Sequence, residues 1–100
     1  MAYSCDFEVE GRVQGVFFRA CTEKKAKELG LVGWVMNTPQ GTVKGVCQSE
    51  DKNSLDQMMY WLSTEGSPSS RIDTCRFSNE REDLSSVEFD NFIVKRRGGY

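Results

Sequence analysis

Apolar and polar residues alternate near the start of the chain, and the period then changes to that of a helix. In residues 5–11 the apolar Cys5, Phe7 and Val9 alternate with carboxylates, which is typical of a half-buried strand. Beyond this stretch, apolar or small residues recur with the i, i+4, i+8, i+11 spacing of one helix face. That face consists of Phe18, Thr22, Ala26 and Leu29. Gly30 is expected to end this helix, because glycine readily adopts the left-handed conformation found after helix C-termini.

A hairpin and a second helix follow. Residues 31–37 and 42–48 are rich in β-branched and aromatic residues, and the turn-forming segment 38–41 between them predicts a hairpin. The next apolar face has i, i+3, i+4, i+7 spacing, which predicts an amphipathic helix and is typical of core packing. It consists of Leu55, Met58, Met59 and Leu62. Ser54 and Gln57 have the spacing of a capping box at its N-terminus.

Two more strands complete the predicted order. Residues 72–79 alternate weakly, and residues 87–94 are rich in aromatic and β-branched side chains. The order β-α-β-β-α-β with a short final strand predicts an α+β fold. We expect a ferredoxin-like split βαβ sandwich, with an antiparallel sheet and two helices on one face. The 100 residues, of which 38% are hydrophobic, suit a single domain over 1–100, with a flexible tail at 95–100.

Charge and composition narrow the classes of function. The chain has 13 basic and 15 acidic residues, and three of the basic ones stand at 95–97, so a nucleic-acid interface is disfavoured. No apolar run approaches the roughly 20 residues of a membrane helix, and no leader follows Met1, so we expect no membrane insertion and a cytoplasmic location. Four cysteines in apolar-patterned segments are interpreted as reduced, small buried hydrophobes. They are Cys5, Cys21, Cys47 and Cys75.

The absence of histidine is the strongest restriction on chemistry. It excludes Ser-His and Cys-His nucleophile pairs and every metal site that needs an imidazole. Carboxylates at metal-ligand spacing are also missing from residues 11–43, so we expect no metal. The chemistry must therefore use guanidinium, amine, carboxylate, amide, hydroxyl or thiol groups.

The segment from Gly11 to Arg19 is a candidate anion site. It joins the first predicted strand to the first predicted helix, and Gly11 and Gly15 permit backbone N–H groups to point inward around an anion. The helix N-terminus adds unsatisfied N–H groups and a positive dipole end, and Arg19 could bind two phosphate oxygens. An ordinary strand-to-helix turn with a surface arginine explains the same spacing equally well.

Asn37 is the second candidate, because it ends a predicted strand immediately before a turn. The residue pattern favours an Asx turn, in which the asparagine side chain bonds its own backbone. The alternative is a functional amide that holds a water molecule through its carbonyl and N–H groups together.

Residues 11–19 and 33–43 together resemble the paired motifs of the acylphosphatase family. The two segments read GRVQGVFFR and GWVMNTPQGTV, and the resemblance extends over about residues 5–94. Further matching segments are Trp61-Leu62, 66–73, 77–80 and 89–92. The likeness is to the stand-alone enzymes of animal tissues rather than to the similar domain of larger maturation proteins.

This resemblance implies a hydrolase that cleaves the carboxyl–phosphate bond of acyl phosphates to a carboxylate and inorganic phosphate, without metal or cofactor. Arg19 matches the family's phosphate-binding arginine, Asn37 matches the residue that orients the attacking water, and Thr38 supports that asparagine. The matching amide cradle consists of Gln14, Gly15, Val16, Phe17 and Phe18. The implied partner is a small acyl phosphate, with inorganic phosphate as product and competitive inhibitor, and we expect a monomer.

Two other functions are considered. A phosphate-binding module without turnover would use the same loop, but it has no need of Asn37. An RNA-binding module on the same fold needs an aromatic motif on exposed central strands, which the sequence lacks. Release of phosphate from benzoyl phosphate would separate all three.

Three features depart from the family pattern. Ser49 stands where the family usually has glycine, which leaves the shape of that turn open. Met36 stands where relatives often carry a basic residue, which would weaken substrate attraction near the site. The basic end Lys95–Tyr100 extends beyond the last predicted strand. We expect it to be solvated and dispensable, with an anionic partner as the less favoured alternative.

Overall fold

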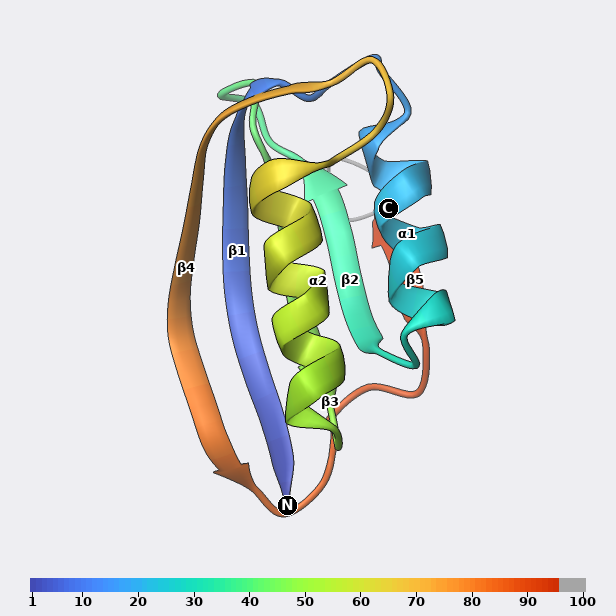
Figure 1. Ribbon diagram of the computed structural model, residues 1–100, viewed down its shortest axis with the longest axis vertical. Helices are drawn as coiled ribbons and strands as arrows, with labels where there is room; N and C mark the ends of the chain where they lie inside the picture. The colour runs from blue at the N-terminus through green and yellow to red at the C-terminus, as the bar shows by residue number, and fades with distance from the viewer. Residues whose placement is uncertain (96–100) are drawn as a thin grey trace.

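The computed structural model describes residues 1–95 of the 100-residue chain. Seven elements follow one another in the expected order (Figure 1). They are β1 (Ala2–Arg12), α1 (Phe18–Glu28), β2 (Val32–Asn37), β3 (Val43–Ser49), α2 (Lys52–Thr64), β4 (Arg71–Leu84) and β5 (Phe92–Lys95). Lys95, expected in the tail, is the last residue of β5. The rest of the predicted tail, residues 96–100, lies outside the described residues.

The five strands form one sheet in the order β4-β1-β3-β2-β5, and both helices cover the same face of it (Figure 1). β1 pairs antiparallel with β3 and β4, and β2 pairs antiparallel with β3. The predicted α+β, ferredoxin-like fold is confirmed. β5 departs from the antiparallel arrangement, because it pairs in parallel with β2. This follows from the chain path, since β4 ends at the end of the sheet where β2 begins.

Two strand boundaries near the C-terminus differ from the prediction. β4 has 14 residues instead of covering 72–79, and β5 begins at Phe92 rather than at Val87. β4 is an edge strand with mostly exposed side chains, so its backbone pairing with β1 continues where no apolar alternation marks it. Register shifts along the β1–β4 pair interrupt the period further.

α2 begins earlier than its apolar face indicated. Asp51 is the N-cap, and its carboxylate accepts hydrogen bonds from the Asn53 N–H at 3.0 Å and from the Ser54 hydroxyl at 3.3 Å. The predicted capping box of Ser54 and Gln57 is therefore wrong, since Ser54 lies inside the helix. Ser49 accepts a hydrogen bond from the Asp51 N–H through its hydroxyl at 2.9 Å, so this serine stabilises the turn whose shape the sequence left open.

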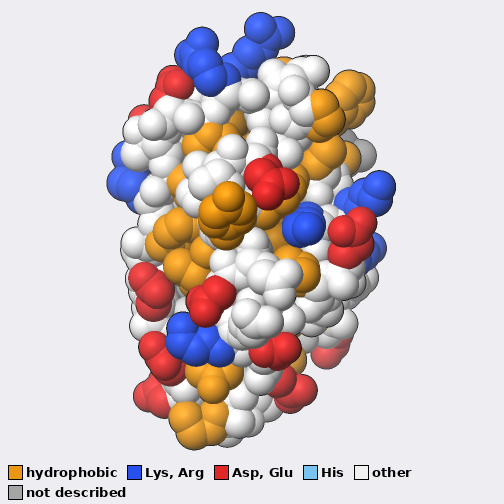
Figure 2. All heavy atoms as spheres, viewed as in Figure 1, with side chains coloured by type: hydrophobic (Ala, Val, Ile, Leu, Met, Phe, Trp, Pro, Cys, Tyr) orange, Lys and Arg blue, Asp and Glu red, His pale blue; other side chains and the backbone are white. Residues whose placement is uncertain are grey.

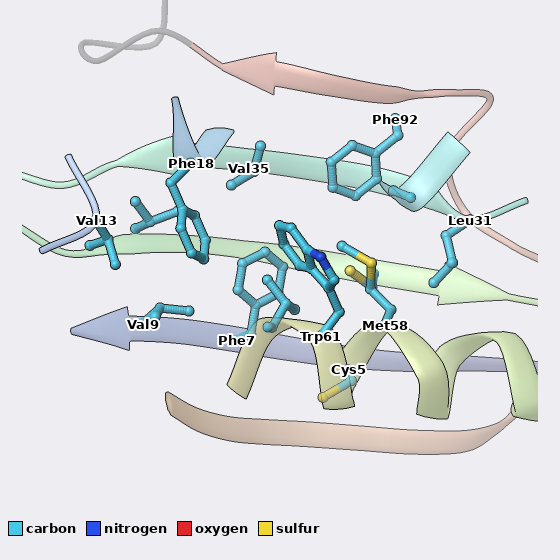
Figure 3. Close-up of a cluster of buried hydrophobic side chains, with 14 of the residues drawn as sticks. Cys5, Phe7, Val9, Val13, Phe18, Leu31, Val35, Met58, Trp61 and Phe92 are labelled. Carbon is cyan, nitrogen blue, oxygen red and sulfur yellow. The ribbon is translucent and has the colours of Figure 1, made fainter. Parts of the chain in front are cut away.

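The core lies between the sheet and the two helices (Figure 3). Phe7 of β1, Phe18 of α1 and Trp61 of α2 are buried there, and the ring centroids of Phe18 and Trp61 are 5.7 Å apart. A Cβ atom at Gly45 of β3 would lie 2.6 Å from the Phe7 ring, so glycine makes room for that ring. This packing anchors the first turn of α1 against the rest of the domain.

The four cysteines differ in burial. Cys5 and Cys47 are buried, whereas Cys21 and Cys75 are half-buried, and all four are free thiols. The expectation of buried hydrophobes is thus confirmed for two of them. Burial raises the pKa of Cys5 to about 12 and that of Cys75 to about 11, so these two thiols stay protonated near neutral pH.

Candidate active site

The loop between β1 and α1 has a backbone conformation that its residue types do not favour. Gly15 and Phe17 have φ angles of 74° and 61°, both in the left-handed region. Glycine adopts this conformation freely, whereas a residue with a side chain is destabilised by roughly 1–2 kcal/mol. Phe17 is also the N-cap of α1, yet its side chain makes no capping hydrogen bond and is 81% exposed. Such strain is typical of a functional segment.

This backbone leaves the N-terminus of α1 open. The first backbone bond of the helix runs from the Cys21 N–H to the Phe17 carbonyl at 3.0 Å. The N–H groups of Phe18, Arg19 and Ala20 precede it, and no described side chain accepts a hydrogen bond from them. Unpaired N–H groups at the positive end of a helix dipole form a ready site for an anion.

A cleft of about 390 Å³ lies beside this loop. Its lining consists of Val13, Gly15, Phe17, Phe18, Arg19, Ala20, Glu23 and Val94. Arg19 is half-buried, and no carboxylate of residues 1–95 lies within ion-pair distance of its guanidinium. The structure thus brings Arg19 and the open end of α1 to one small cleft, where a guanidinium and backbone amides can bind phosphate oxygens together.

Gln14 connects the β1–α1 loop to the β2–β3 turn. Its side-chain Nε2 donates hydrogen bonds to the carbonyl oxygens of Thr38 at 2.9 Å and Thr42 at 2.8 Å. Figure 1 shows the loop and the turn at the same end of the sheet. Val16 of the predicted cradle has its side chain buried in the core, so only its backbone can face an anion. The sequence placed Gln14 in the cradle but did not reveal that its amide joins the two segments.

Thr38 belongs to a short series of hydrogen bonds. Its hydroxyl lies 2.6 Å from that of Thr42, which in turn donates to the Glu8 carboxylate at 2.6 Å. Because the Thr42 proton goes to Glu8, the Thr38 hydroxyl is the donor to Thr42. This series fixes the turn that follows Asn37. Sequence analysis missed Thr42 and Glu8, since they are 34 residues apart and no motif connects them.

Asn37 ends β2, where it pairs with Val43. Its side-chain oxygen Oδ1 is buried and has no hydrogen-bond partner in the described part of the chain. The Asx-turn interpretation is therefore wrong. Such a turn needs the N–H two residues on, and Pro39 has none. A buried unpaired amide oxygen is destabilising by about 1–3 kcal/mol, which marks this oxygen as an acceptor for a water or ligand.

Arg19 follows the β1–α1 loop and Asn37 precedes the β2–β3 turn, and these segments lie at the same end of the sheet (Figure 1). Asn37 is not among the described residues that line the cleft around Arg19. The connection between them is the bond from the Gln14 side chain to the Thr38 carbonyl, next to Asn37 in the chain. The Gln14 amide thus joins the loop that precedes Arg19 to the turn that follows Asn37.

The wider surface adds charge near this end of β2. Met36 pairs with Lys44 on one side and Lys95 on the other, so a basic residue flanks this methionine on each neighbouring strand. On the helix-bearing face, basic and acidic side chains are interspersed (Figure 2). Among residues 1–95, no three histidine, cysteine or acidic side chains are grouped as metal ligands. Neither α1 nor α2 has the length and apolar character to span a membrane.

Comparison with known proteins identifies close relatives. The acylphosphatase family model matches residues 5–92. Acylphosphatase-2 of Gallus gallus is 58% identical over 93 residues, which cover 92% of this chain and 87% of the relative. Acylphosphatase-2 of Homo sapiens is 54% identical over 93 residues, with 92% and 91% covered.

Solved structures agree with these sequence matches. An acylphosphatase from Bacillus subtilis has a TM-score of 0.81 at 28% identity, and the match covers 92% of this chain and 97% of that one. An acylphosphatase from Coxiella burnetii has a TM-score of 0.79 at 35% identity, with 94% and 93% covered. With a family model over most of its length and relatives above 50% identity, the chain belongs to the acylphosphatase family of enzymes.

Proposed function

We propose that this chain hydrolyses the carboxyl–phosphate bond of acyl phosphates by direct attack of water on phosphorus. The family supports the reaction, and the β1–α1 loop supports the way in which phosphate is held. Backbone amides of residues 14–18 would surround the phosphate oxygens, and the Arg19 guanidinium would bind two of them. The products are a carboxylate and inorganic phosphate, and inorganic phosphate fits the same cradle as a competitive inhibitor.

The observation that carries turnover, rather than binding alone, is the buried and unpaired Oδ1 of Asn37. Such an oxygen can accept a hydrogen bond from the attacking water and hold it in line with phosphorus. A module that only binds phosphate gains nothing from it. Gln14 joins the loop to the turn beside Asn37, and Thr38 holds that turn. Phosphate and water would therefore meet in a fixed geometry, which supplies much of the rate.

In the proposed step, the water oxygen bonds to phosphorus while the bond from phosphorus to the acyl oxygen breaks. The electron pair of that bond leaves on the carboxylate. One proton stays on the attacking oxygen, and the other passes to a neighbouring phosphate oxygen. The transition state is loose, with charge on the equatorial oxygens, which preorganised amides and Arg19 stabilise. A carboxylate leaves readily, so the step needs neither a histidine nor a metal ion.

We also propose that the enzyme acts as a cytoplasmic monomer on small molecules. Four free cysteines fit a reducing compartment. The formal net charge of −2 at pH 7 is unlike the strongly basic balance typical of nucleic-acid-binding domains. The physiological acyl phosphate would then be a metabolite or another small carrier of the reactive bond.

The test is release of inorganic phosphate from acetyl phosphate and benzoyl phosphate by the full chain after treatment with a chelator. We expect turnover that survives the chelator and is inhibited competitively by added phosphate. Asn37→Ala should lose turnover, and Asn91→Ala should keep it, because Asn91 is exposed and outside the candidate site. Phosphate binding without turnover would make the chain a binding module, and activity restored only by Mg²⁺ would contradict the metal-free step.

A further inference from the structure

Glu8 of β1 is connected to the candidate site by a hydrogen bond, although it lies outside both sequence motifs. Its carboxylate accepts a hydrogen bond of 2.6 Å from the Thr42 hydroxyl, 34 residues further along the chain. Lys44 stands directly opposite Glu8 on β3, so the carboxylate reaches diagonally past that lysine to the β2–β3 turn. A short hydrogen bond to a charged group is among the stronger polar contacts in proteins.

This carboxylate determines the direction in which the hydroxyl protons of the turn point. A carboxylate can only accept hydrogen bonds, so Thr42 donates to Glu8 and Thr38 donates to Thr42 at 2.6 Å. The Thr38 oxygen then accepts a hydrogen bond from the Thr42 N–H at 3.2 Å. Without Glu8, either threonine could donate to the other, and the two hydroxyls would no longer have one fixed arrangement.

The same hydrogen bonds enclose the backbone that carries Asn37. Thr38 directly follows Asn37 in the chain. Thr42 precedes Val43, which is the register partner of Asn37. Both threonines are buried, with 4% and 8% of their surfaces exposed, so water competes little for these bonds. The position of the unpaired Asn37 Oδ1 therefore depends on a turn that Glu8 orders from β1.

Glu10 provides an internal comparison for Glu8. It lies two residues later on β1, and alternate residues of a strand share one face. The Arg76 guanidinium pairs with both carboxylates, and the two side chains are exposed to similar extents, 36% for Glu8 and 39% for Glu10. Exposed ion pairs of this kind contribute little to stability. The feature that distinguishes Glu8 is its hydrogen bond to Thr42.

We propose that Glu8 is a positioning residue of the hydrolytic reaction, which orders the β2–β3 turn through Thr42 and Thr38 and so holds the Asn37 amide in place for the attacking water. This inference rests on the proposed hydrolysis and adds to it a residue that acts through others rather than on the substrate. Because misplacement of a catalytic group by about 1 Å is costly, loss of Glu8 should reduce kcat. Phosphate binding at the N-terminus of α1 should remain.

The first experiment measures kcat, KM and phosphate inhibition with benzoyl phosphate. Glu8→Ala should lower kcat about tenfold and leave KM and the inhibition constant of phosphate within about twofold of the wild type. Glu8→Gln should restore most of kcat, because an amide oxygen can also accept the Thr42 proton. Glu10→Ala is the matched control and should leave all three constants unchanged, since Arg76 then keeps Glu8 as a partner.

A second experiment combines each alanine variant with Thr42→Val, which removes the hydroxyl that Glu8 binds. In that background Glu8→Ala should cause no further loss of kcat, because residues in one hydrogen-bond network are not additive. An equal loss in both backgrounds would show that Glu8 acts without Thr42 and would overturn the inference.

Circular dichroism checks that each variant is folded. If Glu8→Ala does not fold, Glu8→Leu takes its place, since it also removes the acceptor but keeps a side chain of similar bulk. A folded variant of either kind with the kcat of the wild type overturns this inference alone. Absence of phosphate release by the wild type overturns the proposed function and this inference with it.

Discussion

The two helices of this domain begin in opposite ways. At α2, the Asp51 carboxylate accepts hydrogen bonds from the Asn53 N–H and the Ser54 hydroxyl, so the chain supplies its own anion to the helix N-terminus. At α1, the N-cap is Phe17 in a left-handed conformation, and its side chain makes no capping bond. The unpaired N–H groups at the helix N-terminus are thus capped by a side chain in α2, whereas in α1 no side chain caps them.

This difference indicates that the N-terminus of α1 is less stable than that of α2. A missing cap destabilises a helix by about 0.5–2 kcal/mol, and the left-handed phenylalanine adds roughly 1–2 kcal/mol. Arg19 then adds a cation where the helix dipole disfavours one. A phosphate dianion at the N-terminus of α1 would offset the missing cap and the charge of Arg19 together, while the backbone strain at Phe17 would remain. An open helix end beside an arginine is therefore better evidence for an anion site than the glycines of the loop are.

Asn37→Ala is expected to have the largest effect and to leave the open end of α1 intact. Turnover should fall by about 10²–10³ in kcat, as for loss of one preorganised group, while the inhibition constant of phosphate stays near that of the wild type. This pattern identifies an interaction made mainly in the transition state. The test measures kcat and phosphate inhibition in this variant. Circular dichroism checks its folding, and Asn91→Ala is the exposed control. A folded Asn37→Ala that keeps its kcat contradicts the role assigned to this amide.

Arg19→Gln should act on binding as well as turnover. Loss of a charged hydrogen-bond donor should weaken phosphate inhibition by about 10–100-fold and slow turnover too. Arg19→Lys should rescue poorly, because an ammonium cannot form two parallel bonds to phosphate. Arg71→Gln is the matched control, since it removes only an exposed ion pair with Asp73. Equal phosphate affinity in Arg19→Gln and the wild type would exclude Arg19 from the cradle.

The fold could be predicted wherever one face of an element is buried. The β1 alternation and the apolar faces of both helices produced the element order correctly, because burial imposes the period. The strand at 72–79 was predicted, but the full length of β4 was not, because backbone bonds that leave no period in the sequence hold an exposed edge strand. The parallel direction of β5 was not predicted either, because it depends on where β4 ends in space.

The part of the candidate site that lies in one continuous segment of the sequence could be predicted. The loop and Arg19 form one segment, and the structure places them in one cleft. The bonds that hold the segments together join residues distant in sequence, as between Gln14 and Thr42 or Thr42 and Glu8, and no local pattern reveals them. The Asx-turn interpretation of Asn37 failed on a local detail, because Pro39 has no N–H to donate.

Phe17→Asp would make α1 begin as α2 does, with a carboxylate at its N-cap. Aspartate tolerates the left-handed backbone, and its charge would compete with phosphate for the same N–H groups. Phosphate inhibition should weaken about three- to tenfold relative to Phe17→Asn, which has the same size without the charge. The inhibition constants of the two variants provide the measurement. Equal constants would show that phosphate does not bind at the N-terminus of α1.

Asp51→Ala makes the reciprocal change, since it opens the N-terminus of α2 without creating a phosphate site. Loss of the cap should lower the free energy of unfolding by about 1 kcal/mol and Tm by about 4–8 °C for a domain of this size. Thermal and urea unfolding measure the effect, with Asp56→Ala on the exposed side of α2 as a control that loses only a weak ion pair with Lys52.

Turnover and phosphate inhibition in Asp51→Ala should match the wild type, because this helix end has no arginine and no left-handed N-cap beside it. If opening α2 created a second phosphate site of similar affinity, a free helix N-terminus alone would suffice for binding. Arg19 and the loop geometry would then lose their assigned importance. If stability falls while phosphate inhibition stays constant, the two helix ends have different roles: the N-terminus of α2 stabilises the fold, and the N-terminus of α1 binds the ligand.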